Sequence, residues 1–347
     1  MKAILIGDTH HGENNNSDKT NEDLLEFYRF VVKESKKRKI KKLCHLGDFF
    51  HQRDKLDIKT IKYGIQGAEI LNERFSGIYH DRPELILGNH DLYYKNSREI
   101  HSSEILNDHF DVIEHPFIEE NVMFSPWVTD EQDWDDLIDL YNDHNPDFVL
   151  GHFEFSRFRL NQNYVMEHGY SHKKFKRAKK VFTGHYHTRQ EMDNVVYIGS
   201  PIPFNFNDAN DPERGFCILD LETGEHEFVN FKKSQFLSID HESFLNEDFD
   251  VPEDVSVRVE IAGDCDDKTM DAIKEKLEST SFRNSKIQYT PSRYKEIVES
   301  VNDGEVSDIE NIDGSVIKYL QESSETEGID NELLVELYNK AIENDNI

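Results

Sequence analysis

The sequence predicts an α/β protein in which two β-sheets pack into a sandwich. In the first part of the chain, short apolar runs typical of buried strands alternate with stretches of helical periodicity. More closely spaced strand-like runs follow and form a β-rich second part. From this order we expect one sheet to carry the early motifs of the chain and the other sheet to carry the late ones.

Each element is predicted from its own residues. Strands are expected where short apolar runs occur, over residues 1–8, 41–46, 85–87, 121–128, 148–153, 180–183 and 195–198. Helices are expected over 21–39, where Asn21 suits the N-cap, and over about 58–75. Residues 93–108 form a polar segment. Two final strands over 215–221 and 226–231 flank a hairpin turn at 222–225.

The composition changes after about residue 245 and indicates smaller units. Residues 255–261 alternate as a half-exposed strand does, 267–279 are helical and 286–289 are strand-like, which gives a β-α-β module. Residues 298–312 are acidic, and short amphipathic helices follow at 315–321 and 331–342. The expected division is a main domain over 1–240, a capping module over 245–295, an acidic linker over 296–313 and a helical segment over 314–347.

The last predicted helix places Leu333, Leu337 and Tyr338 on one apolar face. Such a short helix buries little area on its own, so we interpret it as an element that docks onto a partner protein. A frayed tail that binds nothing is the alternative.

The charge and composition exclude several classes of protein. A net charge of −30 argues against a protein that binds nucleic acid unaided, because such proteins carry a basic surface. One basic cluster, Lys173–Lys180 with Arg157 and Arg159 nearby, is either a DNA or partner contact or a solvated surface. No apolar run approaches the ~18 residues of a membrane span, and Ala3–Ile6 is too short for a signal-peptide core. The three cysteines form no CxxC pair. These features indicate a cytoplasmic protein without membrane contact.

Polar side chains follow five of the predicted strands at the point where each strand ends. Open α/β sheets bind ligands at this edge, so we expect these side chains to lie together. The motifs are Gly7-Asp8-Thr9-His10, Gly47-Asp48 with His51 and Arg53 beyond it, Gly88-Asn89-His90-Asp91, Gly151-His152 and Gly184-His185-Tyr186-His187. Any one of them alone is usually a turn or an ordinary histidine, but five in order indicate a site.

Seven of these residues form a set of oxygen and nitrogen donors that suits Mn²⁺, Fe²⁺ or Zn²⁺. They are Asp8, His10, Asp48, Asn89, His152, His185 and His187. Seven ligands are too many for one ion but suit two ions that share one ligand. Asp48 is the best candidate for the shared ligand, because a carboxylate can span two cations. Two metal ions clamp the attacking and leaving oxygens of a phosphoryl group, so the set indicates phosphoryl chemistry.

The five motifs resemble, in order and residue type, those of the calcineurin-like metallophosphoesterases. Within that superfamily the chain is most similar to SbcD, the nuclease subunit of double-strand-break repair complexes, and to its counterpart, the recombination nuclease subunit, in large tailed phages. His51 stands where the protein phosphatases of the superfamily have a second Asp, and Asp91 stands where they have Glu. Residues 197–204, followed by Arg214-Gly215-Phe216, resemble the segment after the last SbcD motif. The specific match covers residues 1–235.

The resemblance implies a four-layer sandwich of two mixed sheets flanked by helices, and a role for each motif residue. The implied roles are ligands of one metal ion for Asp8, His10 and His187, ligands of a second ion for Asn89, His152 and His185, and a bridging ligand for Asp48. His90 is implied to assist protonation of the leaving 3′ oxygen. His51 is implied to contact the scissile phosphate, and Arg53 is expected to bind substrate.

The resemblance further implies the activity and its partners. These are manganese-dependent exonuclease and endonuclease cleavage of DNA ends, hairpins and single strands, by a homodimer that works with a large SMC-like coiled-coil ATPase in the cytoplasm. Two other classes stay open. A small phosphomonoesterase or cyclic-nucleotide phosphodiesterase would share all five motifs. A non-catalytic scaffold on the same fold would be expected to lose metal ligands, and this sequence has all of them.

Overall fold

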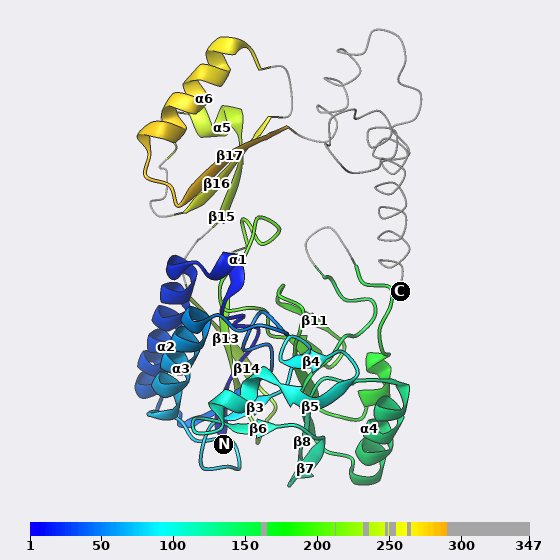
Figure 1. Ribbon diagram of the computed structural model, residues 1–347. Helices are drawn as coiled ribbons and strands as arrows, with labels where there is room; N and C mark the ends of the chain where they lie inside the picture. The colour runs from blue at the N-terminus through cyan, green and yellow to red at the C-terminus, as the bar shows by residue number, and fades with distance from the viewer. Residues whose placement is uncertain are drawn as a thin grey trace, which may run out of the picture. The chain divides into compact units, whose positions relative to one another are not determined.

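The computed structural model describes residues 1–289 apart from 161–164, 212, 232–235, 247–248, 250–254 and 262–264. The predicted helical segment, with Leu333, Leu337 and Tyr338, lies outside the described residues, as does the predicted acidic linker. Two six-stranded sheets dominate the part of the chain that carries the motifs, as the ribbon in Figure 1 shows. The predicted fold class, a mixed α/β sandwich, is confirmed.

The first sheet contains the early strands and has the order β14-β13-β1-β2-β3-β6. The strands are β1 Lys2–Ile6, β2 Lys42–His45, β3 Glu84–Ile86, β6 Asp111–Ile113, β13 Gly215–Asp220 and β14 His226–Asn230. β1, β2, β3 and β6 are parallel, whereas β13 is antiparallel to both β1 and β14. Because parallel strands end at the same edge, the loops after β1, β2 and β3 meet there.

The second sheet has the order β11-β12-β10-β9-β8-β7. Its strands are β7 Phe117–Glu119, β8 Val122–Ser125, β9 Phe148–His152, β10 Lys180–Gly184, β11 Gln190–Met192 and β12 Val195–Tyr197. The four central strands are parallel, and β7 and β11 are antiparallel edge strands. The loops that follow β9 and β10 therefore also lie at one edge.

Helices cover the outer face of each sheet and complete four layers. The inner faces of the two sheets pack on each other through a cluster that includes Leu5, Leu150 and Phe182. Outside the first sheet lie α2 (Asp18–Arg38) and α3 (Ile58–Asn72), which contact each other (Figure 1). Outside the second sheet lies α4 (Glu131–His144).

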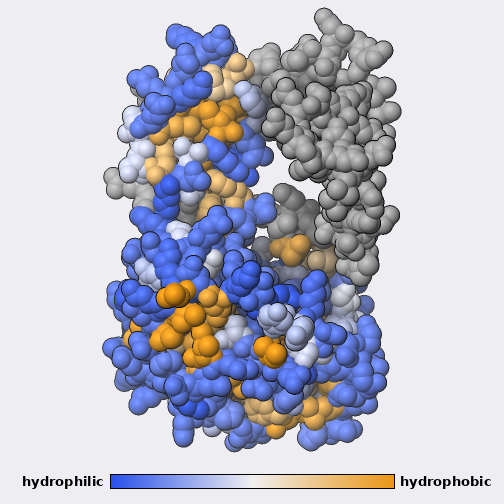
Figure 2. Space-filling view, viewed as in Figure 1, coloured by the Kyte–Doolittle hydropathy of each residue, from blue (hydrophilic) through white to orange (hydrophobic). Residues whose placement is uncertain are grey.

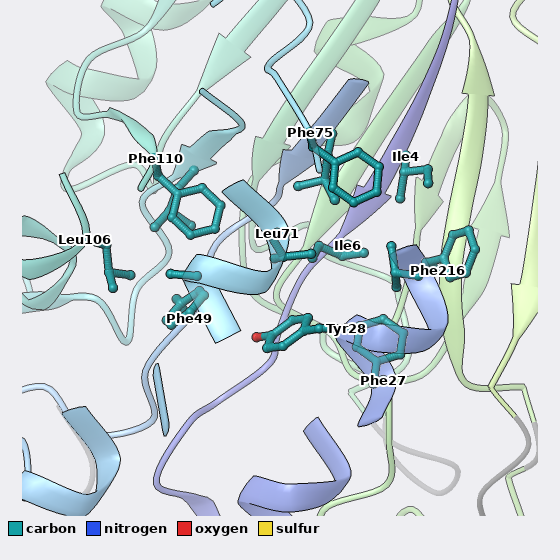
Figure 3. Packing of buried hydrophobic residues seen from close by; sticks show 14 of the residues in the cluster. Ile4, Ile6, Phe27, Tyr28, Phe49, Leu71, Phe75, Leu106, Phe110 and Phe216 are labelled. Atoms are coloured by element: carbon teal, nitrogen blue, oxygen red, sulfur yellow. The ribbon is translucent and has the colours of Figure 1, made fainter. Parts of the chain in front are cut away.

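The cluster beneath α2 and α3 supports the loops that carry the motifs. Figure 3 shows Phe27 and Tyr28 of α2 packed near Ile6 of β1, with Phe49 of the loop after β2 in the same cluster. Each of these side chains is fully buried. Full burial of such a side chain stabilises the fold by ~1.5–3 kcal/mol. The residue that follows Asp48 is thus anchored in the core.

The remaining elements are short or belong to a small α/β module. The short elements before residue 176 that lie outside the two large sheets are the turn α1 Glu13–Asn16, the hairpin of β4 Leu92–Tyr94 and β5 Ser97–His101, and the 3₁₀ turns η1 Ser102–Leu106 and η2 His172–Phe175. The module contains β15 Phe236–Asp240, α5 His241–Leu245, β16 Ser256–Ile261, α6 Asp267–Ser279 and β17 Asn284–Tyr289, with sheet order β15-β16-β17.

Several local predictions differ from the structure. The first long helix begins at Asp18 with Ser17 at its N-cap, so the cap predicted at Asn21 is wrong. The Asn21 amide lies inside the helix and donates to Asn16 Oδ1 at 2.9 Å. The polar segment at 93–108 contains a β-hairpin that the sequence did not predict, and α4, α5 and β15 were also missed.

The surface reflects the composition. Figure 2 shows hydrophilic side chains over most of the viewed face of the described residues, as expected for a chain with a net charge of −30. Cys44 and Cys217 are buried free thiols. Among the described residues, no helix has the length and apolar character that crossing a membrane requires.

Candidate metal centre

The ends of five strands bring the seven predicted ligands together where the two sheets meet. The contributing ends are those of β1 for Asp8 and His10, β2 for Asp48, β3 for Asn89, β9 for His152, and β10 for His185 and His187. Direct hydrogen bonds join the two sheets here. The His185 backbone N–H donates to Asp8 Oδ1 at 2.8 Å, and His152 Nδ1 lies 2.7 Å from the Leu46 carbonyl oxygen.

The first group of donor atoms comprises Asp8, His10 and His187. Their potential ligand atoms lie within 4.8 Å of one another. The two imidazoles face each other, with His10 Nε2 3.0 Å from His187 Nε2. Asp8 Oδ2 is buried and has no hydrogen-bond partner. A buried, unpartnered carboxylate oxygen beside two converging nitrogens fits a divalent cation.

The second group comprises Asn89, His152 and His185, with Asp48 beside them. Asn89 Oδ1 lies 3.1 Å from His152 Nε2 and 3.0 Å from His185 Nδ1. The ligand atoms of Asp48, His152 and His185 also lie within 4.8 Å of one another. An amide oxygen between two imidazole nitrogens is a second donor set of mixed oxygen and nitrogen type.

Asp48 lies between the two groups. Its Oδ2 atom is 3.5 Å from His10 Nε2 and 3.5 Å from His152 Nε2, so one carboxylate oxygen faces both groups. The other oxygen, Oδ1, accepts a hydrogen bond of 2.8 Å from the His90 backbone N–H. The carboxylate is therefore fixed with one oxygen bound to protein and the other between the groups.

Burial and the neighbouring carboxylates shift the pKa values of the residues in this site, in different directions for different residues. Burial raises the pKa of Asp8 to about 7, and the nearby Asp48 carboxylate adds to this increase. Burial opposes charge on His152, but the carboxylates of Asp48 and Asp8 outweigh it and raise the pKa of His152 to about 9. Burial lowers the pKa of His10 and of His185 well below the usual value. Neutral imidazoles are the form that binds a metal ion.

The backbone at these positions is unusual. Asp8, His10, Asp48 and His185 all have positive φ angles, of 52°, 45°, 53° and 96°. The left-handed conformation turns the chain sharply at the end of each strand, which directs the side chains toward the edge of the sheets. This conformation costs roughly 1–2 kcal/mol for each residue.

One curated protein is clearly related to the chain. Exonuclease subunit 1 of Enterobacteria phage T4 is 28% identical to it over 236 residues, which are 66% of this chain and 67% of that protein. The chain is a homologue of this phage exonuclease subunit, and its five motifs resemble those of the calcineurin-like metallophosphoesterases. No family model matches it.

Solved structures resemble the chain only weakly. A novel archaeal phosphodiesterase is 15% identical, with a TM-score of 0.33, and the match covers 67% of this chain and 100% of that one. A dimetal phosphatase from Danio rerio is 11% identical, with a TM-score of 0.35, and the match covers 63% of this chain and 91% of that one. The two donor groups of the chain are candidate sites for divalent metal ions.

Asp91 supports the site in a way that the sequence did not reveal. Its buried carboxylate accepts hydrogen bonds from the backbone N–H groups of Gly88 at 2.8 Å, Asp48 at 3.0 Å and Phe49 at 3.1 Å. It thereby ties the loop after β2 to the loop after β3. Gly88 is required at this junction, because a Cβ atom there would collide with Asp48 Oδ1. The motif placed Asp91 at the sheet edge, but two of these partners, Asp48 and Phe49, lie more than forty residues away along the chain.

His51 and His90, the predicted catalytic residues, lie next to the first group. His90 Nδ1 lies 2.6 Å from the His51 carbonyl oxygen. A carbonyl oxygen only accepts hydrogen bonds, so Nδ1 carries a proton and Nε2 is left for other partners. The His51 and His90 rings are stacked, with centroids 5.4 Å apart. His51 Nε2 also lies 2.7 Å from Glu13 Oε2, in the turn after β1, and this acidic partner was not predicted from the sequence.

We expect Glu13→Gln to lower kcat/KM for phosphodiester hydrolysis by about 10- to 100-fold, the range typical when a residue that orients a metal-site histidine is lost. The amide keeps the shape of the side chain but removes the charge that orients His51. Bound metal measured by elemental analysis should stay unchanged, because Glu13 belongs to neither donor group. Glu22→Gln, at an exposed position of α2, is the matched control. A loss of metal in the Glu13 variant would show instead that Glu13 supports the donor groups.

Arg53 and Trp127 lie at a cleft that opens beside the second group. Arg53, predicted to bind substrate, lines this cleft together with Asn89 and His185. Trp127 also lines it, with its ring centroid 5.0 Å from that of His185. Trp127 was not among the predicted site residues, although it lies only two residues after the end of β8 at Ser125.

Proposed function

We propose that the chain is a manganese-dependent DNA nuclease that holds two metal ions and hydrolyses phosphodiester bonds at DNA ends in repair and recombination, with both exonuclease and endonuclease activity. The observation that carries the proposal is the position of Asp48 Oδ2, 3.5 Å from a histidine of each donor group. This arrangement suits two cations that share one carboxylate. The similarity to a phage protein named as an exonuclease subunit supports DNA as the substrate.

The metal ligands are assigned from the two groups. Asp8, His10 and His187 would hold one ion, Asn89, His152 and His185 would hold the other, and Asp48 would be shared by both. When bound, the two cations would supply an activated water molecule and neutralise the charge that develops on the phosphate. Oxygen and imidazole donors without thiolate suit Mn²⁺, Fe²⁺ or Zn²⁺, and among these we propose Mn²⁺ on the resemblance to SbcD-type nucleases.

The chain's own residues complete the hydrolysis. Water adds to phosphorus, the bond from phosphorus to the leaving 3′ oxygen breaks, and that oxygen must gain a proton. His90 holds the proton for this step on the ring nitrogen that does not contact the His51 carbonyl oxygen. His51, oriented by Glu13, contacts the scissile phosphate. Arg53 binds substrate from the adjoining cleft.

Purified chain assayed with Mn²⁺ against three substrates tests the proposal. Linear DNA with labelled ends should be degraded, while 2′,3′- and 3′,5′-cyclic nucleotides and nitrophenyl phosphate should be hydrolysed far more slowly. Preference for a cyclic nucleotide or for the monoester would show a small-molecule phosphodiesterase or phosphatase. Absence of activity on all three, with two Mn²⁺ ions bound, would indicate a scaffold.

We propose the same division of the chain as the sequence predicts. The nuclease domain spans residues 1–240, a capping module that contacts DNA spans 245–295, and an acidic linker over 296–313 leads to a helical segment over 314–347. This last segment, through Leu333, Leu337 and Tyr338, binds an SMC-like coiled-coil ATPase in a cytoplasmic complex of two nuclease chains. The printed name of the phage relative, a subunit, supports a multi-protein complex. The net charge of −30 weakens the affinity of the isolated chain for DNA, so we expect tight DNA binding to depend on that partner.

Truncation after Ile312 should separate the nuclease from its partner. Leaving three apolar side chains exposed forfeits ~1.5–3 kcal/mol each, and docking onto the ATPase recovers this free energy. The shortened chain is expected to keep two Mn²⁺ ions and basal cleavage but to lose co-purification with the ATPase and stimulation by ATP. The point variant Leu337→Asp, which keeps the full length, should act in the same direction. Aggregation or a much lower melting temperature of the truncated chain would place the helices in the core instead.

A further inference from the structure

The cleft beside the second donor group has the size and lining of a ligand site. Its volume is about 540 Å³, within the range of about 300–1,000 Å³ found for small-molecule sites. Asn89 and His185 form the wall that it shares with the donor group. The rest of the lining combines the aromatic rings of Trp127 and Tyr170 with the cationic side chains of Arg53 and Lys95.

Both backbone polar groups of Trp127 form hydrogen bonds that hold the residue in place. Its N–H donates to the Leu87 carbonyl oxygen at 2.8 Å, which attaches it to the strand before Asn89. Its own carbonyl oxygen accepts a hydrogen bond of 2.6 Å from Arg98 Nη1. The Arg98 guanidinium in turn forms two hydrogen bonds of 2.7 Å with Asp133. The indole, which is only partly buried, is therefore a rigid wall of the cleft.

Tyr170, which also lines the cleft, is similarly fixed. Its ring stacks on Trp134 of α4, with centroids 4.2 Å apart and an angle of 13° between the rings. Its backbone N–H donates to the Glu154 carbonyl oxygen at 2.9 Å. Both aromatic walls are thus positioned before any ligand arrives, so little entropy is lost when a ring binds between or against them.

We propose that this cleft binds the base of the nucleotide adjoining the scissile phosphate, and that Trp127 is the ring on which the base stacks. The inference rests on the proposed nuclease function, in which the scissile phosphate binds at the adjacent donor groups. A nucleobase is a neutral, planar group, and an indole face stacks on any of the four bases. Glu131 and Glu154 line the same cleft, and their carboxylates disfavour a second phosphate deep inside it while accepting hydrogen bonds from base amino groups. Arg53 and Lys95 suit the neighbouring backbone phosphate.

The test compares oligonucleotides that differ only at the cleaved position. One carries normal nucleotides on both sides of a defined phosphodiester, and the other carries abasic residues there. Stacking of one base on an aromatic side chain corresponds to roughly 5- to 150-fold in affinity. The wild-type chain with Mn²⁺ is expected to prefer the normal substrate by a factor in this range in kcat/KM. Trp127→Ala should abolish the preference by slowing cleavage of the normal substrate alone, and Trp127→Phe should restore it in part.

Tyr94→Ala is the matched control, since Tyr94 is an exposed aromatic residue of β4 that does not line the cleft. It should leave the preference unchanged. Equal cleavage of the two substrates by the wild-type chain would overturn the proposal. An equal loss on both substrates in Trp127→Ala would also overturn it, because Trp127 would then act only as support for His152 and His185.

A binding measurement separates this proposal from the proposed function. In the variant Trp134→Phe, Trp127 is the single tryptophan left of the two in the chain. Its fluorescence should be quenched by thymidine 5′-monophosphate but not by deoxyribose 5-phosphate, whether or not the protein cleaves DNA. If the nucleotide quenches the fluorescence of a chain that has no nuclease activity, base binding in the cleft is supported and the proposed nuclease function is refuted. Identical responses to the two ligands would refute the cleft assignment.

Discussion

Replacing Asp48 by Asn is expected to lower DNA cleavage by more than about 10³-fold, beyond the loss that follows removal of one charge-stabilising donor. The amide oxygen of Asn can still accept the hydrogen bond that Asp48 Oδ1 receives from the His90 backbone. This orientation turns the NH₂ group toward the position of Oδ2, 3.5 Å from both His10 Nε2 and His152 Nε2. An NH₂ group has no lone pair for a cation, so bound Mn²⁺ should fall below two per chain by elemental analysis.

The fold should survive this change. Asn tolerates the positive φ of 53° at this position better than most residues, and the backbone bonds to Asp91 involve no atom that is altered. Asp54→Asn, at an exposed position of the same loop, is the matched control and should keep full activity. Retention of two tightly bound ions in the Asp48 variant would refute the bridging assignment.

Replacing His90 by Asn should lower cleavage by about 10²–10⁴-fold, the usual contribution of a general acid or base, and should leave the metal content nearly intact. The Asn side-chain amide can still donate to the His51 carbonyl oxygen, as His90 Nδ1 does. The second ring nitrogen, which carries the transferable proton, has no counterpart in Asn. Single-turnover cleavage and elemental analysis measured on the same preparation would separate the two effects.

His115→Asn, which alters an exposed histidine far along the chain from the motifs, controls for the loss of an imidazole. If the His90 variant loses metal together with activity, His90 supports the donor groups and is no proton donor. A DNA substrate with a leaving group that needs no protonation, such as a 3′-bridging phosphorothiolate, should be cleaved by the variant at close to the wild-type rate.

The sequence predicted the two sheets and the edge on which the motifs meet because the signals for both are local. A short apolar run closed by Gly and a polar residue marks the end of a strand wherever it occurs. The helix α4 was missed although Trp134, Leu137, Ile138 and Tyr141 have helical spacing and Asp130 caps it through the Asp133 N–H. Acidic residues lie between these four, so the apolar face of the helix is narrow and hard to recognise in the sequence. All four side chains are nevertheless buried in the core.

The supporting residues of the site were harder to predict because their partners lie far away along the chain. Asp91 accepts hydrogen bonds from a loop more than forty residues earlier. Glu13 approaches His51 in the segment after β1, where His10 and Gly12 have positive φ angles. Trp127 reaches His185 through the pairing of β8 with β9 and of β9 with β10. These contacts follow from register and loop conformation, which a single sequence does not display.

The positive φ angles at the candidate metal centre limit which amino-acid substitutions these positions accept. Among residues other than Gly, positive φ angles are most frequent for Asn, Asp and His, the same types that supply oxygen and nitrogen donors here. Asp8, His10, Asp48 and His185 therefore satisfy two requirements at once, one set by the donor atoms and one by the backbone. Glu and Cys could offer donor atoms at these positions but fit the backbone less well. The range of acceptable substitutions is narrower than coordination chemistry alone would allow, and metal specificity is more readily altered at His152 or Asn89, which are absent from the residues with positive φ.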